Sequence, residues 1–264
     1  MLDIRGSVAV ITGGGRGIGR ALAEYWVAGG GQVVLADIAE DALEEAKSSL
    51  ESLGGSVVCV PCNTTREADC AKLADAAIEA FGKINLVAPF AGITRDSLVL
   101  STDRETGKVG AKMSLDQFQS VLDINVTGVF LTVRECAERM INCNCKGLIC
   151  LISSTGSLGT AGQLNYSASK AAMAVMPKVL TAEFFRRGFA DKIRCVAIAP
   201  GYVGTPMVRG MRQNVLDKII DQVPIGRLID PYEVASLVGE LYRNEAIAGE
   251  VFFIHGGLRL GSRG

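Results

Sequence analysis

The chain has 264 residues, of which 48% are hydrophobic and 21% charged, and its formal net charge is −1. This length suits one large α/β domain or two small ones, and the near-neutral charge gives no general attraction to nucleic acid or to an anionic membrane. No stretch approaches about eighteen uninterrupted apolar residues, so no transmembrane helix is expected, and residues 1–15 lack a signal peptide's apolar core. We therefore expect a cytoplasmic protein that binds neither nucleic acid nor membrane.

A glycine-rich turn follows the first predicted strand, the β-branched run 7–12. Its glycines precede a periodic helix over about residues 18–28, and they are Gly13, Gly14, Gly15, Gly17 and Gly19. Glycine lets the backbone approach a ligand closely, and a helix N-terminus presents unpaired N–H groups, so strand, turn and helix together suit the phosphates of a dinucleotide. The spacing TGxxxGxG indicates that role, and the alternative is a flexible turn.

The second predicted strand, 32–36, ends at Asp37, about twenty residues after the glycines. A carboxylate here can accept hydrogen bonds from both ribose hydroxyls of NAD, and it would repel the extra phosphate of NADP. The alternative is that Asp37 caps the helix predicted over 40–53, and both roles could hold. Arg16 in the glycine turn could meet a phosphate, so NADP(H) stays possible while NAD(H) is favoured.

The remaining pattern alternates strands with helices. Further strands are predicted over 56–60, 84–88, 148–152, 193–198 and 250–254, and further helices over 67–81, 115–140 and 166–187. This alternation predicts a parallel sheet covered by helices on both faces. Residues 101–114 are polar and contain glycine, so a surface loop is expected there. No change of composition marks a second domain, and we predict a single α/β domain over residues 1–264.

Two side chains with acid–base chemistry stand four residues apart at the start of the helix predicted over 166–187. Tyr166 and Lys170 would share one helical face, and an ammonium beside a phenol lowers the phenol pKa from about 10. Ser153 follows the strand 148–152, and a glycine-containing loop could fold its hydroxyl onto the tyrosine. These three groups would surround one polar atom, as carbonyl chemistry requires. The YxxxK spacing alone favours the alternative of an ordinary helix surface.

The chain has eight cysteines and one histidine, His255. Cys59 and Cys62 form a CxxC pattern, and Cys143 and Cys145 form a CxC pattern, which could suggest a metal or redox pair. Reduced thiols that act as small buried hydrophobes are the favoured interpretation for a cytosolic chain. We therefore predict no metal site.

Five motifs in this order resemble the short-chain dehydrogenase/reductase family: TGGGRGIG (12–19), Asp37, LDINVTGVF (122–130), Ser153 with YSASK (166–170), and APGYVGTPM (199–207). They span almost the whole chain. The segments VPIGRLIDPYEVASLV (223–238) and GGLRL (256–260) look like the 3-oxoacyl-carrier-protein reductase branch and its bacterial carbonyl-reductase relatives. The resemblance implies a doubly wound Rossmann fold with a seven-stranded parallel sheet in the order 3-2-1-4-5-6-7, and commonly a homotetramer.

The resemblance also implies a role for each catalytic position. Tyr166 would be the acid in ketone reduction and the base in alcohol oxidation. Lys170 would hold the nicotinamide ribose and lower the tyrosine pKa. Ser153 lies thirteen residues before Tyr166 and would bind the substrate oxygen in preference to its neighbour Ser154. Asn125 would hold a water that links Lys170 to solvent.

The positions implied to bind the cofactor are spread along the chain. They are Gly13, Arg16, Gly17, Ile18, Gly19, Asp37, Ile38, Asn63, Thr64, Ala91, Gly92, Tyr166, Lys170, Pro200, Gly201, Val203 and Thr205. Three sites depart from the family pattern: Pro89-Phe90 replaces two asparagines, Asn63 replaces an acid, and Pro177 lies within the helix of Tyr166. Pro89-Phe90 affects the rigidity of the backbone beside the cofactor. Pro177 predicts a kink in its helix and an altered assembly of subunits.

The sequence thus predicts an NAD(H)-dependent oxidoreductase that interconverts a ketone and a secondary alcohol, of the carbonyl-reductase type. One alternative is an NADPH-dependent 3-oxoacyl thioester reductase of fatty acid synthesis. Another is a dinucleotide-binding protein without turnover, for which Pro89-Phe90 counts weakly. Residues 202–228 are a candidate substrate lid. Val208, Met211, Val215 and Leu216 recur there at helical spacing, which indicates either an apolar substrate face or ordinary helix packing.

Overall fold

The apolar runs of the sequence form one seven-stranded parallel sheet in the computed structural model, which describes residues 1–258. Its strands in spatial order are β3 (Val57–Pro61), β2 (Gln32–Asp37), β1 (Val8–Thr12), β4 (Leu86–Pro89), β7 (Gly147–Ile152), β8 (Ile193–Pro200) and β9 (Val251–Ile254). All residues of β1, β4, β7 and β8 are buried, because helices cover both faces of the sheet. The predicted Rossmann fold and strand order are confirmed. The last two residues of the GGLRL motif lie outside the described residues.

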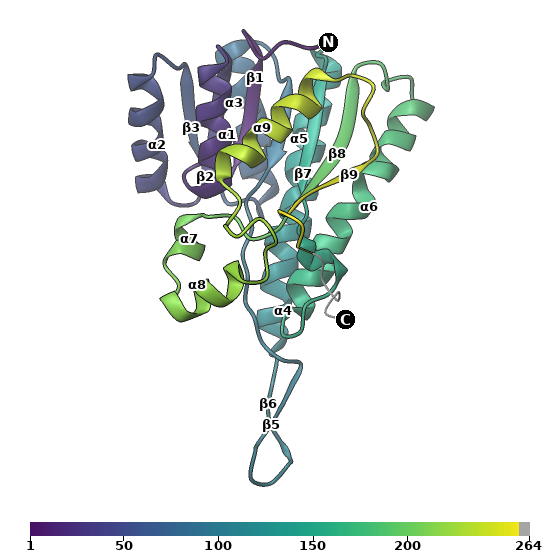
Figure 1. Cartoon of the computed structure of the whole chain (residues 1–264). Helices are drawn as coiled ribbons and strands as arrows, with labels where there is room; N and C mark the ends of the chain where they lie inside the picture. The colour runs from purple at the N-terminus through teal and green to yellow at the C-terminus, as the bar shows by residue number, and fades with distance from the viewer. Residues whose placement is uncertain (259–264) are drawn as a thin grey trace.

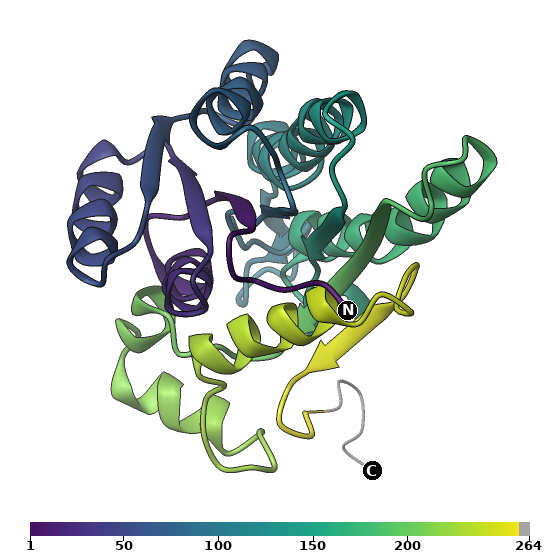
Figure 2. The same ribbon diagram turned by 90° about the horizontal axis from the view of Figure 1, so that it is seen from above.

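Two helical layers enclose the sheet (Figure 2). One layer contains α1 (Gly17–Ala28), α2 (Glu40–Ser52) and α9 (Pro231–Arg243), and the other contains α3 (Glu67–Phe81), α5 (Gly128–Asn142) and α6 (Leu164–Arg186). Each layer has its own hydrophobic core against one face of the sheet. Since the strand order reverses between β1 and β4, the loops at their carboxyl ends diverge and leave a crevice there.

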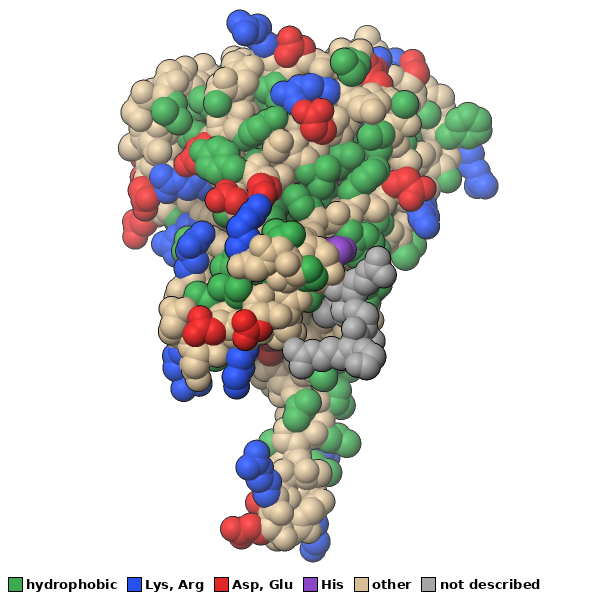
Figure 3. All heavy atoms as spheres, viewed as in Figure 1, with side chains coloured by type: hydrophobic (Ala, Val, Ile, Leu, Met, Phe, Trp, Pro, Cys, Tyr) green, Lys and Arg blue, Asp and Glu red, His purple; other side chains and the backbone are tan. Residues whose placement is uncertain are grey.

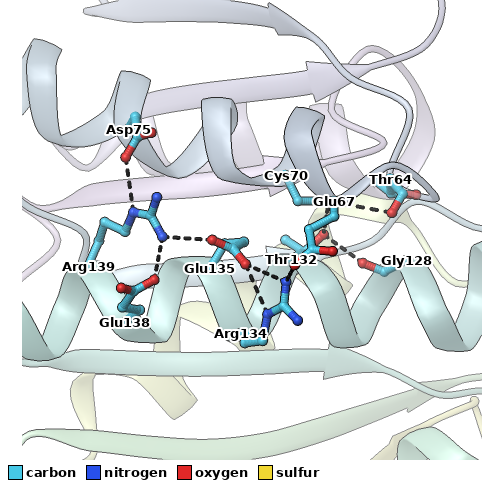
Figure 4. A network of polar contacts seen from close by, with 10 residues as sticks. All are labelled: Thr64, Glu67, Cys70, Asp75, Gly128, Thr132, Arg134, Glu135, Glu138 and Arg139. Atoms are coloured by element: carbon cyan, nitrogen blue, oxygen red, sulfur yellow. Dashed lines mark hydrogen bonds and ion pairs between the residues drawn. The ribbon is translucent and has the colours of Figure 1, made fainter.

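An ionic network joins α3 to α5 (Figure 4). The buried carboxylate of Glu135 accepts hydrogen bonds from Arg134 Nε at 2.9 Å and from Arg139 Nη1 at 2.7 Å. Arg139 also donates to Asp75 on α3 at 3.0 Å. Because Glu135 has two cationic partners, its burial is compensated, and the Arg139–Asp75 contact joins the two helices.

The predicted helix 115–140 is interrupted. It divides into α4 (Leu115–Leu122), a π-helical turn at Asp123–Thr127, and α5. The wider turn carries Asn125, whose side chain is fully buried, as is common where a π-turn serves a functional site. By contrast, α6 continues from Leu164 to Arg186 with Pro177 inside it.

The surface loop expected over 101–114 is instead a hairpin of β5 (Leu100–Thr102) and β6 (Val109–Lys112), which projects away from the sheet (Figure 1). Asp103 organises its tip, since Oδ1 accepts hydrogen bonds from the backbone N–H groups of Thr106 at 2.7 Å and Glu105 at 3.1 Å. Apolar side chains are exposed near the hairpin base and charged ones at its tip (Figure 3).

The segment predicted as a lid contains α7 (Pro206–Arg209) and α8 (Gln213–Ile220), and it lies beside the carboxyl ends of the strands (Figure 1). A short 3₁₀ turn at Thr155–Leu158 follows β7. Within residues 1–258, none of the helices has the length and apolar character needed to cross a membrane.

Candidate active site

Two adjoining cavities open at the carboxyl ends of the strands. The larger, of about 790 Å³, is lined by the glycine turn and by the ends of β2 and β3. The smaller, of about 370 Å³, is lined by Tyr166, Lys170 and the segments after β7 and β8. They share the lining residues Ile18, Phe90, Gly92, Ile93, Ile152 and Thr205. Every position that the sequence predicted to bind a cofactor lines one cavity or the other.

The glycine turn brings the N-terminus of α1 against the end of β4. Gly13 has a φ of 65°, and a Cβ there would lie 3.0 Å from the backbone of Ala91. A Cβ on Gly19 would lie 2.2 Å from the carbonyl oxygen of Gly13. Only glycine therefore fits at these two positions. The larger cavity thus has a backbone cradle at a helix N-terminus, which suits the pyrophosphate of a dinucleotide.

Asp37 joins the second strand to this cradle. Its Oδ2 accepts a hydrogen bond from Gly15 N at 3.2 Å, and its Oδ1 accepts one from Ala39 N at 3.1 Å. Ala39, and not Asp37, is the N-cap of α2, so the helix-capping alternative is wrong. The carboxylate lines the larger cavity at the end of β2, where a ribose would meet it.

The two serines after β7 have different partners. The buried Ser153 donates from Oγ to the carbonyl oxygen of Lys170 at 2.7 Å. The Ser154 hydroxyl lowers the pKa of the Tyr166 phenol, and it accepts a hydrogen bond from Gly156 N at 3.0 Å. Both serines line the smaller cavity with Tyr166, so the catalytic role of Ser153 stays a prediction and Ser154 is a second candidate. Ser154 has extended backbone angles, and successive side chains of an extended segment point to opposite sides.

The pKa of Tyr166 moves opposite to the expected direction. Burial raises it, the hydrogen bond from Ser154 lowers it, and the negative charge of Asp96 raises it further. Lys170 does not contribute the expected lowering, because its Nζ lies 5.5 Å from the phenol ring centroid and donates to Ile152 O at 3.0 Å. Burial of this lysine lowers its own pKa to about 8.

Asn125 cross-links the loop after β4 to α6. Its Oδ1 accepts from Ile93 N at 2.9 Å, and its Nδ2 donates to Ile93 O at 3.0 Å and to Ser169 Oγ at 3.1 Å. Both amide hydrogens are thus used inside the protein. Ala91 N donates to Thr12 Oγ1 at 3.1 Å, so a threonine on β1 ties down the segment after Pro89-Phe90.

Several residues that sequence reasoning missed also line the smaller cavity. Phe90 and Ile93 line both cavities, and Asp96, Gln163 and Tyr202 line the smaller one. The lid contributes Val208 and Met211 to this lining, so part of its apolar pattern faces the cavity. Phe90 and Ile93 flank the predicted pair Ala91 and Gly92, and that neighbourhood was the available signal.

The CxxC cysteines are not paired with each other. Cys59 donates from Sγ to Leu43 O at 3.6 Å, whereas the Cys62 thiol contacts that of Cys70. Among residues 1–258, no group of three or more histidine, cysteine or acidic side chains could hold a metal ion.

Comparisons with known proteins identify the family of this chain. The family model described as short chain dehydrogenase matches residues 7–216. The chain is 32% identical over 259 residues to the 3-oxoacyl-[acyl-carrier-protein] reductase FabG of Salmonella typhimurium, with 97% of this chain and 99% of that protein covered. It is also 32% identical over 268 residues to the (3R)-3-hydroxyacyl-CoA dehydrogenase of Canis lupus familiaris, with 97% and 98% covered. The chain therefore belongs to the short-chain dehydrogenase family.

Proposed function

We propose that this protein interconverts a 3-oxoacyl thioester and the corresponding 3-hydroxyacyl thioester by using a nicotinamide dinucleotide. The observation that carries the proposal is the phenol of Tyr166 in the smaller cavity, beside the Ser154 hydroxyl that lowers its pKa, with the larger cavity adjoining it. The names of the relatives favour thioesters over the broad range of ketones expected from the sequence, because a 3-oxoacyl reductase and a 3-hydroxyacyl dehydrogenase act on the two ends of one reaction.

The residues of the smaller cavity would position the substrate carbonyl and supply a proton. When bound, the dinucleotide supplies or accepts the hydride. In reduction, Tyr166 donates its phenolic proton to the carbonyl oxygen, on which negative charge accumulates. Ser154 donates a hydrogen bond to the same oxygen and stabilises that charge. Ser153 and Lys170 also line this cavity, and the hydrogen bond from Ser153 Oγ to the backbone carbonyl of Lys170 joins the end of β7 to α6.

Substitution of the two adjacent serines provides the sharpest test. We expect Ser154→Ala to lower kcat with an acetoacetyl thioester about 10²-fold or more, by loss of one oxyanion donor, and Tyr166→Phe to abolish turnover. Ser153→Ala is the matched control and should mainly lower the stability. The measurement is NADH oxidation against a panel of thioesters, simple ketones and sugars. Activity confined to simple ketones, or a larger kcat loss for Ser153→Ala, would contradict the proposal.

The cofactor proposed is NAD(H), and Asp37 is the residue that supports it. Its carboxylate at the end of β2 would repel a 2′-phosphate. Asp37→Ala should therefore narrow the preference for NADH over NADPH, whereas Asp41→Ala, an exposed change in the first turn of α2, should not. An equal or higher kcat/KM with NADPH in the parent protein would overturn this assignment. NADH binding without turnover of any compound in the panel would instead favour a non-catalytic dinucleotide-binding protein.

A further inference from the structure

The smaller cavity contains a carboxylate that the proposed reaction does not use. Asp96 follows β4 by a short loop and lines this cavity. Its Oδ2 accepts a hydrogen bond from Gln163 Nε2 at 2.7 Å, and Gln163 also lines the cavity. The next residue, Ser97, donates from its backbone N–H to Gly162 O at 2.8 Å. The carboxylate is therefore held in place opposite the first turn of α6.

The two charged side chains that line this cavity differ in how freely they can meet a substrate. Among the described residues that line it, Asp96 is the one carboxylate and Lys170 is the one cation. The Lys170 ammonium is buried and donates to Ile152 O at 3.0 Å. Arg95, the neighbour of Asp96, pairs with Asp116 on α4 at 2.8 Å. A substrate carboxylate in this cavity would thus meet a fixed negative charge, and no arginine among the described lining residues would receive it.

The field of Asp96 reaches the reacting group. Burial has the largest influence in raising the pKa of Tyr166, and the charge of Asp96 adds to it. A negative charge that acts on the phenol oxygen also acts on a substrate group bound beside that oxygen.

We propose that Asp96, positioned by Gln163, is a specificity-determining residue that excludes substrates with a free carboxylate close to the ketone. A thioester or ester of a 3-oxo acid is neutral, whereas the free 3-oxo acid is an anion at neutral pH. The cavity would accept the neutral form and reject the anion by like-charge repulsion. The inference rests on the proposed function, because it concerns which 3-oxo compounds the same site takes.

The test compares methyl acetoacetate with acetoacetate, which differ chiefly in charge. The parent protein should prefer the ester. Asp96→Asn keeps the shape and can still accept from Gln163, and it should reduce the ester-to-acid ratio of kcat/KM about tenfold at low ionic strength. The effect should weaken with added salt, since Asp96 is exposed to solvent. Asp103→Asn, which removes a carboxylate at the hairpin tip, is the matched control and should leave the ratio unchanged.

Binding provides a second readout that does not need turnover. The Tyr166→Phe protein with NADH bound can be titrated calorimetrically with each compound. Adding Asp96→Asn should raise its affinity for acetoacetate relative to its affinity for methyl acetoacetate. Asp96→Lys should strengthen acetoacetate binding further. If neither substitution changes the relative affinity for acid and ester, Asp96 does not determine this selectivity. Absence of turnover in the parent protein with a preserved affinity difference would count against the proposed function alone.

Discussion

Replacement of Lys170 by methionine should stabilise the folded protein while removing its activity. The lysine side chain is 5% exposed, and its burial lowers its pKa from 10.5 to about 8. Below pH 8 this group is charged in both the folded and the unfolded chain. The pKa difference corresponds to about 3 kcal/mol by which the buried charge destabilises the fold. Methionine has a similar length and carries no charge, so the substitution removes the destabilisation caused by the buried ammonium.

Part of the gain is offset by a lost hydrogen bond. Lys170 Nζ donates to Ile152 O at 3.0 Å, and methionine would leave that carbonyl without this partner, which costs about 1 kcal/mol. We therefore expect Lys170→Met to raise the free energy of unfolding at pH 7 by about 2 kcal/mol. Lys178→Met changes an exposed lysine on the same helix and is the matched control, for which about 0.5 kcal/mol or less is expected.

The pH dependence has a definite sign. Between pH 8 and 10.5 the unfolded chain keeps the Lys170 proton and the folded chain has lost it, so the stability of the parent rises with pH through this window. The advantage of Lys170→Met should vanish by pH 10. Urea denaturation of the dinucleotide-free proteins at pH 7 and pH 10 can be followed by the fluorescence of the single tryptophan, Trp26, which is fully buried. A variant less stable than its parent at pH 7, or a difference that is constant with pH, would refute this reasoning.

Two further substitutions test the cofactor cradle and the fold. Gly19→Ala would place a Cβ 2.2 Å from Gly13 O, so we expect NADH affinity to fall at least about tenfold in a fluorescence titration while the far-ultraviolet dichroism is retained. Arg194→Met would remove a buried guanidinium that donates to four carbonyl oxygens at and just beyond the end of α9. The free energy of unfolding should fall by about 3 kcal/mol, and an unchanged urea midpoint would show that water can replace those donors.

The strands and most helices could be predicted from local sequence because the buried residues of each element are apolar and recur in a pattern along the chain. Strands buried on both faces are continuous apolar runs, as in β1 and β8. The glycine turn was recognisable because only glycine tolerates the approach of Ala91 and the contact between Gly13 and Gly19. Asp37 followed from its place at the end of the second strand. These features depend on residues that are near one another in the chain.

Other features depended on contacts between distant segments. Ser153 and Ser154 are chemically identical, and only the extended backbone after β7 sends one hydroxyl toward Lys170 O and the other toward Tyr166. The YxxxK spacing predicted an ammonium beside the phenol, but the direction of the tyrosine pKa came from burial. Asp96 lies 70 residues before Tyr166 in the chain. It reaches the cavity only because Ser97 pairs with the segment before α6. Sequence patterns therefore determined which elements form. Packing decided the orientation and the ionisation of the reacting side chains, because both depend on the groups that surround each side chain.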